Sequence, residues 1–75
     1  MSRRPAWGFP ALRVFYDLAP ADAARVDRAV IRFAETGEGE VVHVPPYWRL
    51  HTGRFRVLFT VTPGTVNVLF IYRAR

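Results

Sequence analysis

The chain has 75 residues, a formal net charge of +5 and no cysteine. A chain of this length forms one domain and buries only roughly 60% of its unfolded surface, which favours a stabilising partner. The lack of cysteine excludes a disulfide scaffold and thiolate metal sites, and fits an intracellular protein. The two histidines and few carboxylates show no metal-ligand spacing, so we expect neither a metal nor another cofactor.

The N-terminus and the apolar runs give no sign of membrane insertion. Two arginines follow Met1 and Ser2, as at the start of a signal peptide, but prolines and a glycine interrupt the segment behind them. The longest uncharged run, Val57 to Tyr72, contains Pro63-Gly64 and is short for a membrane helix. We therefore expect a soluble, cytoplasmic protein that does not bind membranes.

The first part of the chain predicts a strand and a helix. Residues 6–9 are predicted to form a short edge strand, which Pro10 ends. Pro10 suits a first helical position, and apolar residues recur at helical spacing from there to Leu18. The apolar alternation between Leu12 and Tyr16 would also suit a strand, so this helix has a rival interpretation.

A second helix is predicted between Pro20 and Gly37, with a carboxylate in its first turn and glycine as its stop. Its apolar stripe consists of Val26, Ala29, Val30 and Phe33. Residues 38–40 are predicted to be a loop, and residues 41–44 a strand that Pro45-Pro46 ends.

Three antiparallel strands are predicted between Tyr47 and Arg73, where β-branched and aromatic residues alternate with the turn signals Thr52-Gly53 and Pro63-Gly64. Turns centred on these pairs place Arg49 across from Arg56. A three-residue first loop would instead shift the pairing by one and scramble the faces. The register adopted here gathers the large apolar residues on one face: Trp48, Leu50, Phe55, Val57, Phe59, Val61, Val66, Val68, Phe70 and Tyr72.

The predicted fold class is therefore α+β, in a single domain spanning residues 1–75. An antiparallel sheet of about four strands carries a helical hairpin on its apolar face, in the order β-α-α-β-β-β. The opposite face of the sheet, called the open face below, has no predicted cover. It carries Tyr47, Arg49, His51, Arg54, Arg56, Leu58, Thr60, Asn67, Leu69, Ile71 and Arg73.

The charge is concentrated in the sheet half of the chain. Residues 41–75 hold five arginines and no acid, whereas residues 1–40 hold six arginines and six acids. Arg49 is predicted to face Arg56, with Arg73 nearby, although like charges across strands are destabilising. These residues could be ordinary solubilising charges, but their clustering without acids favours a site for an anion such as phosphate. Leu58, Leu69 and Ile71 are predicted to form an exposed apolar patch that binds a protein partner.

Several segments resemble the RelE/ParE superfamily of bacterial toxin-antitoxin toxins. They are residues 24–30 (ARVDRAV), 33–37 (FAETG) and 48–59 (WRLHTGRFRVLF), with the strand ending at Tyr72-Arg73. The resemblance spans nearly the whole chain and implies an antiparallel sheet with a helical hairpin on one side. It also implies an antitoxin as partner. Ribonuclease members cut messenger RNA on the ribosome without metal, and another branch poisons DNA gyrase.

The resemblance also implies roles for individual residues. Arg56 matches the strand arginine that clamps the scissile phosphate, Arg49 falls where ribonuclease members have a catalytic lysine, and Arg73 is near a late basic position. Arginine is a poor general base compared with lysine. The C-terminal Tyr or His of many active members has no counterpart up to Arg75, so we expect His51 to serve as substitute acid or base.

Three further residues are expected to bind nucleic acid: Tyr47 by stacking on a base, and Arg54 and Arg75 by contacting phosphate. His51 on a strand could equally be a solvated surface residue. The sequence thus leaves three functions open, an mRNA-cleaving toxin, a gyrase-directed toxin without nuclease chemistry, and a catalytically silent relative.

Overall fold

The computed structural model describes residues 2–74 and has the expected α+β class. The segment after Pro10 is a helix, which excludes the rival strand interpretation. The elements, in chain order, are β1 (Arg4–Trp7), α1 (Phe9–Asp17), α2 (Pro20–Thr36), β2 (Glu40–Val44), β3 (Tyr47–Thr52), β4 (Phe55–Thr62) and β5 (Thr65–Arg73).

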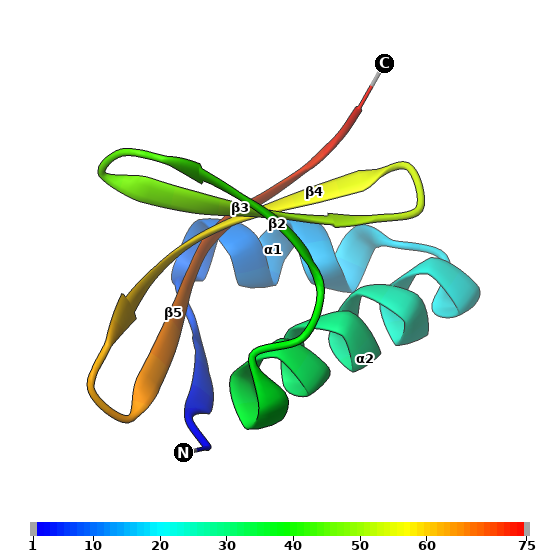
Figure 1. Ribbon diagram of the computed structural model, residues 1–75. Coiled ribbons are helices and arrows are strands. Elements are labelled where there is room, and N and C mark those ends of the chain that lie inside the picture. The colour runs from blue at the N-terminus through cyan, green and yellow to red at the C-terminus, as the bar shows by residue number, and fades with distance from the viewer. Residues whose placement is uncertain (1, 75) are drawn as a thin grey trace.

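The strands form one mixed sheet in the order β1-β5-β4-β3-β2 (Figure 1). Strands β2 to β5 are an antiparallel meander, as the sequence predicts. The N-terminal strand β1 adds a fifth strand, which pairs in parallel with the first residues of β5. Both helices lie on the same side of the sheet (Figure 1), so the other side is the open face.

The core lies between the helices and one face of the sheet. Its buried side chains come from both helices and from β3, β4 and β5: Ala11, Val26, Val30, Ala34, Leu50, Phe55, Val57, Phe59, Val66, Val68 and Ile71. The predicted stripe of α2 is confirmed at Val26 and Val30, while Ala29 and Phe33 pack at the core's edge. Burying one of the Val, Leu, Ile or Phe side chains contributes roughly 1.5 to 3 kcal/mol, so this face holds the two layers together.

A glycine lies at the beginning of α1 and another at the end of α2. Gly8 precedes α1 and donates its N–H to the carbonyl oxygen of Val68 at 2.7 Å, where an added Cβ would lie 2.9 Å from the same oxygen. Glycine therefore lets α1 begin directly against β5. Gly37 ends α2 in the left-handed conformation, with φ of 76°, and its N–H bonds to the oxygen of Phe33.

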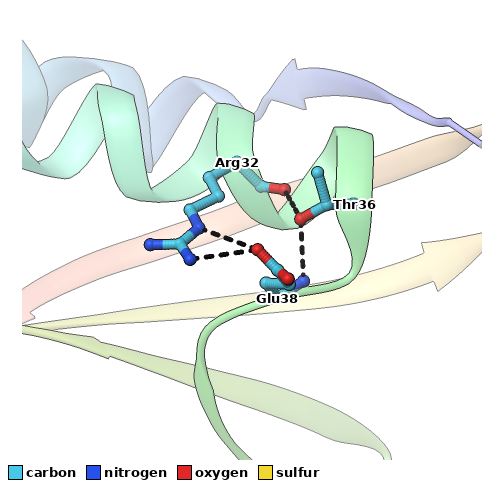
Figure 2. Close-up of polar contacts among 3 residues, drawn as sticks. All are labelled: Arg32, Thr36 and Glu38. Atoms are coloured by element: carbon cyan, nitrogen blue, oxygen red, sulfur yellow. Dashed lines mark hydrogen bonds and ion pairs between the residues drawn. The ribbon is translucent and has the colours of Figure 1, made fainter.

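A polar cluster ties the end of α2 to the loop that leads into β2 (Figure 2). The hydroxyl of Thr36 donates to the carbonyl oxygen of Arg32 at 2.7 Å and accepts the N–H of Glu38 at 3.0 Å. Arg32 donates from Nε and Nη2 to one carboxylate oxygen of Glu38, at 3.2 and 3.0 Å. The charge of Glu38 is thus neutralised by Arg32 of α2. Glu40, two residues further along the chain, is the first residue of β2.

The turn between β3 and β4 differs from the predicted one. Gly53 and Arg54 form it, and Thr52 is the last residue of β3, paired with Phe55. Gly53 has φ of 55° while Arg54 has negative φ, the pattern of a turn with glycine at its first central position. The pairing therefore moves by two residues: His51, not Arg49, faces Arg56, and Arg49 faces Leu58. Because the shift is even, each β3 residue keeps its predicted face.

The pairing of β4 with β5 starts as predicted and then changes. Phe59 faces Val68, but an irregularity between Leu58 and Phe59 makes Leu58 face Phe70. A bulge of this kind inserts one extra residue in a strand and reverses the alternation beyond it. Phe70 and Tyr72 therefore leave the predicted core face, and Ile71 replaces them in the core with 1% of its surface exposed.

Candidate functional site

The open face is organised in lines of residues that run across the strands. One line joins Glu40 of β2, His51 of β3, Arg56 of β4 and Tyr72 of β5. The neighbouring line joins Val42, Arg49, Leu58 and Phe70. Side chains within a line are neighbours, and diagonal positions lie about 7 to 8 Å apart, so Arg49, His51 and Arg56 form one group. We call these three residues the arginine site.

Arg49 and His51 are in direct contact. Nε of Arg49 donates a hydrogen bond to Nε2 of His51 at 3.1 Å. Because Nε2 accepts, the neutral imidazole carries its proton on Nδ1. An oxygen of Glu40 lies 3.6 Å from that Nδ1, and the His51 side chain is 19% exposed. The carboxylate on β2 thus lies on the Nδ1 side of the ring, away from the nitrogen that Arg49 contacts.

Arg56 is held by the backbone of the β3–β4 turn. Its Nη1 donates to the carbonyl oxygens of Gly53 and Phe55, at 3.1 and 2.9 Å. A guanidinium has five N–H donors, so these two bonds fix the group and leave others for a ligand. Within residues 2–74 neither Arg49 nor Arg56 has a carboxylate at ion-pair distance. Arg49 and Arg56 can therefore bind an anion without first leaving a carboxylate of residues 2–74.

Two other predicted arginines lie elsewhere, and a third falls outside the described residues. Arg54 is already paired, because its Nη2 lies 3.1 Å from an oxygen of Asp22 on α2. Arg73 faces Phe55, beyond the bulge, and its Cζ lies 5.7 Å from the centre of that buried ring. The expected convergence of Arg73 with Arg49 and Arg56 is therefore wrong, since the bulge moves it to the helix-covered side. Arg75 lies outside the residues that the structure describes.

The exposed apolar residues of the open face are not the ones that the sequence predicts. Ile71 is buried in the core, so it is not part of the open surface, and Leu58 and Leu69 are only partly exposed. The apolar side chains that do stand exposed on the open face come from β2, β3 and β5. They are Val42, Val44, Tyr47 and Phe70, each 40 to 42% exposed. Tyr47 is thus accessible, as its expected stacking role requires.

The sequence reasoning missed Glu40, Phe70 and Tyr72. The register of the β2–β3 hairpin, whose turn is Pro45-Pro46, was the available signal for Glu40, because a two-residue turn there pairs residue 40 with residue 51. No comparable signal exists for the two aromatic residues, since every residue from 68 to 72 is apolar or aromatic.

The other histidine lies apart from the arginine site, whereas one hollow of the surface borders it. His43 stacks on Trp48, with ring centres 4.1 Å apart, which gives it a packing role. A cavity of about 300 Å³ lies beside the open face, between α2 and the ends of β2 and β3, and Glu40 and His51 form part of its wall. Within residues 2–74, no three His, Asp or Glu side chains gather so that they could hold a metal ion, and no helix is long and apolar enough to cross a membrane.

The chain is similar in structure to two proteins whose structures are solved. No family model matches the sequence, and no curated protein matches it. A chain of the RelE–RelB complex from Pyrococcus horikoshii superposes with a TM-score of 0.79 at 13% identity, covering 97% of this chain and 96% of that one. A chain of the toxin-antitoxin complex RelBE2 from Mycobacterium tuberculosis superposes with a TM-score of 0.71 at 19% identity, covering 97% and 99%. The chain therefore has the RelE fold, which confirms the fold implied by the sequence resemblance.

Proposed function

We propose that the protein is the toxin of a type II toxin-antitoxin pair and that it inhibits translation by cutting messenger RNA on the ribosome. The observation that carries this proposal is the arginine site, where Arg49 and Arg56 flank His51 without a carboxylate to neutralise either guanidinium. The RelE fold supports it, because one structure with this fold is a toxin-antitoxin complex.

The proposed reaction needs cationic side chains that bind the phosphate and a group that accepts a proton. In the proposed reaction a ribose 2′-oxygen attacks the adjacent phosphorus and the bond to the 5′-oxygen breaks, leaving a 2′,3′-cyclic phosphate and a 5′-hydroxyl. Arg49 and Arg56 stabilise the charge that develops on the phosphate oxygens. When Arg49 turns from His51 to the phosphate, Nε2 of His51 becomes free to accept the 2′-hydroxyl proton. The leaving oxygen takes a proton from water.

The partner of the resting protein is an antitoxin that covers the open face. Exposed apolar side chains lie beside the arginine site there: Val42, Val44, Tyr47 and Phe70. Apolar surface on so small a protein favours a protein partner, and an acidic segment would complement Arg49 and Arg56. A partner bound in this way would exclude RNA and keep the toxin inactive.

A second candidate is a gyrase-directed toxin that acts by protein binding alone. It is favoured by the same exposed apolar residues and by Arg49, which stands where the resemblance implies a catalytic lysine. Induction of the unaccompanied protein in a bacterial host distinguishes the functions. The proposal predicts growth arrest, translation-dependent breaks in mRNA and intact DNA, with all effects lost on Arg56→Ala.

The matched control is Arg13→Ala, which removes an exposed arginine from α1. We expect this variant to arrest growth like the wild type. DNA breaks with intact mRNA would support the gyrase alternative, and unaffected growth would contradict both toxins.

A further inference from the structure

A second group of arginines lies on α2, beside the cavity of about 300 Å³ between this helix and the ends of β2 and β3. Arg25, Arg28 and Arg32 are spaced three and four residues apart, so they project from one face of the helix, together with Ala29. All four residues line the cavity, whereas the two arginines of the arginine site do not. The helical wall of the cavity is thus a cationic surface of its own.

Two of these guanidinium groups have no acidic partner. Within residues 2–74, no carboxylate lies at ion-pair distance from Arg25 or Arg28. Asp22 precedes Arg25 by three residues on α2 and could pair with it, but its carboxylate instead accepts a hydrogen bond from Arg54 at 3.1 Å. Both side chains are exposed, so a ligand in the cavity can reach them.

The opposite wall of the cavity offers hydrogen-bond acceptors. It is formed by the first residue of β2 and the last residues of β3, and it includes the carboxylate of Glu40 and the hydroxyl of Thr52. His51, which also belongs to the arginine site, lies in the same wall. A ligand that fills the cavity therefore meets cations on one side and acceptors on the other.

The loop between α2 and β2 borders the cavity and is held in place from both sides. Glu38 accepts two hydrogen bonds from Arg32, and its N–H donates to the hydroxyl of Thr36 (Figure 2). Gly39 lies so close to Leu50 that an added Cβ would be 3.0 Å from Cδ1 of that side chain. The cavity is therefore formed without a ligand, which lowers the entropic cost of binding one.

The size and the charges of the cavity define the class of ligand. Small-molecule sites usually have volumes of about 300 to 1,000 Å³, so this cavity suits a molecule at the lower end of that range. Two free guanidinium groups on neighbouring turns match a phosphate group, because guanidinium binds phosphate oxygens in pairs. The acceptors of the opposite wall match hydroxyl groups on the same molecule. A sugar phosphate has both features.

We propose that this cavity binds a small sugar phosphate, with the phosphate between Arg25 and Arg28 and the sugar hydroxyl groups donating to Glu40 and Thr52. The inference goes beyond the proposed function and does not depend on it. Because His51 lies in the wall of the cavity, the bound ligand is a neighbour of the arginine site without occupying it.

Isothermal titration calorimetry of the purified full chain with ribose 5-phosphate tests the site. We expect Arg25→Ala and Arg28→Ala each to raise the dissociation constant by about tenfold or more, the usual effect of losing one hydrogen bond to a charged group. Glu40→Ala should weaken the binding of ribose 5-phosphate but not that of inorganic phosphate, because only the sugar needs the acceptor. Ribose, which has no phosphate, should not bind measurably.

Two control variants separate the cavity from general charge and from the arginine site. Arg13→Ala removes an exposed arginine from α1, and Arg56→Ala removes one from the arginine site. Both variants should bind ribose 5-phosphate like the wild type, with circular dichroism confirming that every variant is folded.

Three results would overturn the proposal. One is a wild-type protein that does not bind ribose 5-phosphate, and another is binding that Arg56→Ala abolishes and Arg28→Ala leaves intact. The third is weaker RNA binding by Arg28→Ala with no binding of ribose 5-phosphate, which would assign the arginines of α2 to nucleic acid. Cleavage of mRNA by the wild type decides the proposed function separately from each of these results.

Discussion

In the free protein, Nε of Arg49 donates a hydrogen bond to Nε2 of His51 at 3.1 Å. The proposed phosphate-binding group is therefore bonded to the proposed proton acceptor. In the proposed mechanism, phosphate binding by Arg49 releases the imidazole lone pair in the same step. The proposed mechanism couples substrate binding to release of the base through this contact, and an oxygen of Glu40 lies 3.6 Å from the other ring nitrogen of His51, Nδ1.

Replacement of His51 separates its two roles. Glutamine at position 51 can still accept a hydrogen bond from Arg49 but cannot accept the 2′-hydroxyl proton. We expect His51→Gln to bind RNA like the wild type and to lose cleavage rate by about 10² to 10⁴-fold, the usual contribution of general acid–base catalysis. The matched control is His43→Gln, because His43 stacks on Trp48 away from the site. Wild-type cleavage by His51→Gln would show that His51 only supports Arg49.

The salt dependence of RNA binding identifies the arginines that contact phosphate. Each contact with a single strand contributes about 0.7 to the slope of log K against log salt concentration. We expect Arg49→Ala and Arg56→Ala each to reduce the slope by about this amount. Arg54→Ala should change it little, because Asp22 already pairs with Arg54. Arg73→Ala should also change it little, because Arg73 faces Phe55. A larger change for Arg73→Ala than for Arg56→Ala would contradict the assigned faces.

The bulge in β5 can be tested by the stability of two adjacent variants. Ile71 is 1% exposed and Phe70 is 42% exposed. We expect Ile71→Ala to lower the free energy of unfolding by about 2 to 5 kcal/mol, the cost of truncating a buried side chain. Phe70→Ala should cost much less, although it removes the larger group. Urea denaturation followed by circular dichroism measures both values, and the reverse order would place Phe70, not Ile71, in the core.

The sequence predicts the elements of this fold well because proline and glycine mark their ends. Pro10, Pro20 and Gly37 locate the helices, and Pro63-Gly64 locates the last turn as observed. The predicted faces of β3 are correct although its predicted register is wrong, because the pairing moved by two residues and side chains alternate with a period of two.

The site was less predictable because it depends on one inserted residue. Every residue from 68 to 72 is apolar or aromatic, so hydrophobic alternation cannot tell Leu69 and Ile71 from Phe70 and Tyr72. The choice is made by packing, which buries Ile71 against the helices. The position of Arg73 follows from the same bulge, and for that reason Arg73 was expected beside Arg49, His51 and Arg56, where the structure brings together only the last three.

The most direct measurement is cleavage of a defined messenger RNA on stalled ribosomes by the purified protein and by Arg56→Ala. We predict that the wild type produces a fragment ending in a 2′,3′-cyclic phosphate and another beginning with a 5′-hydroxyl. The variant, lacking one of the two groups that stabilise the developing charge, should be slower by about 10² to 10³-fold. Intact mRNA in the presence of wild-type protein, or equal rates for the wild type and Arg56→Ala, would contradict the role of the arginine site.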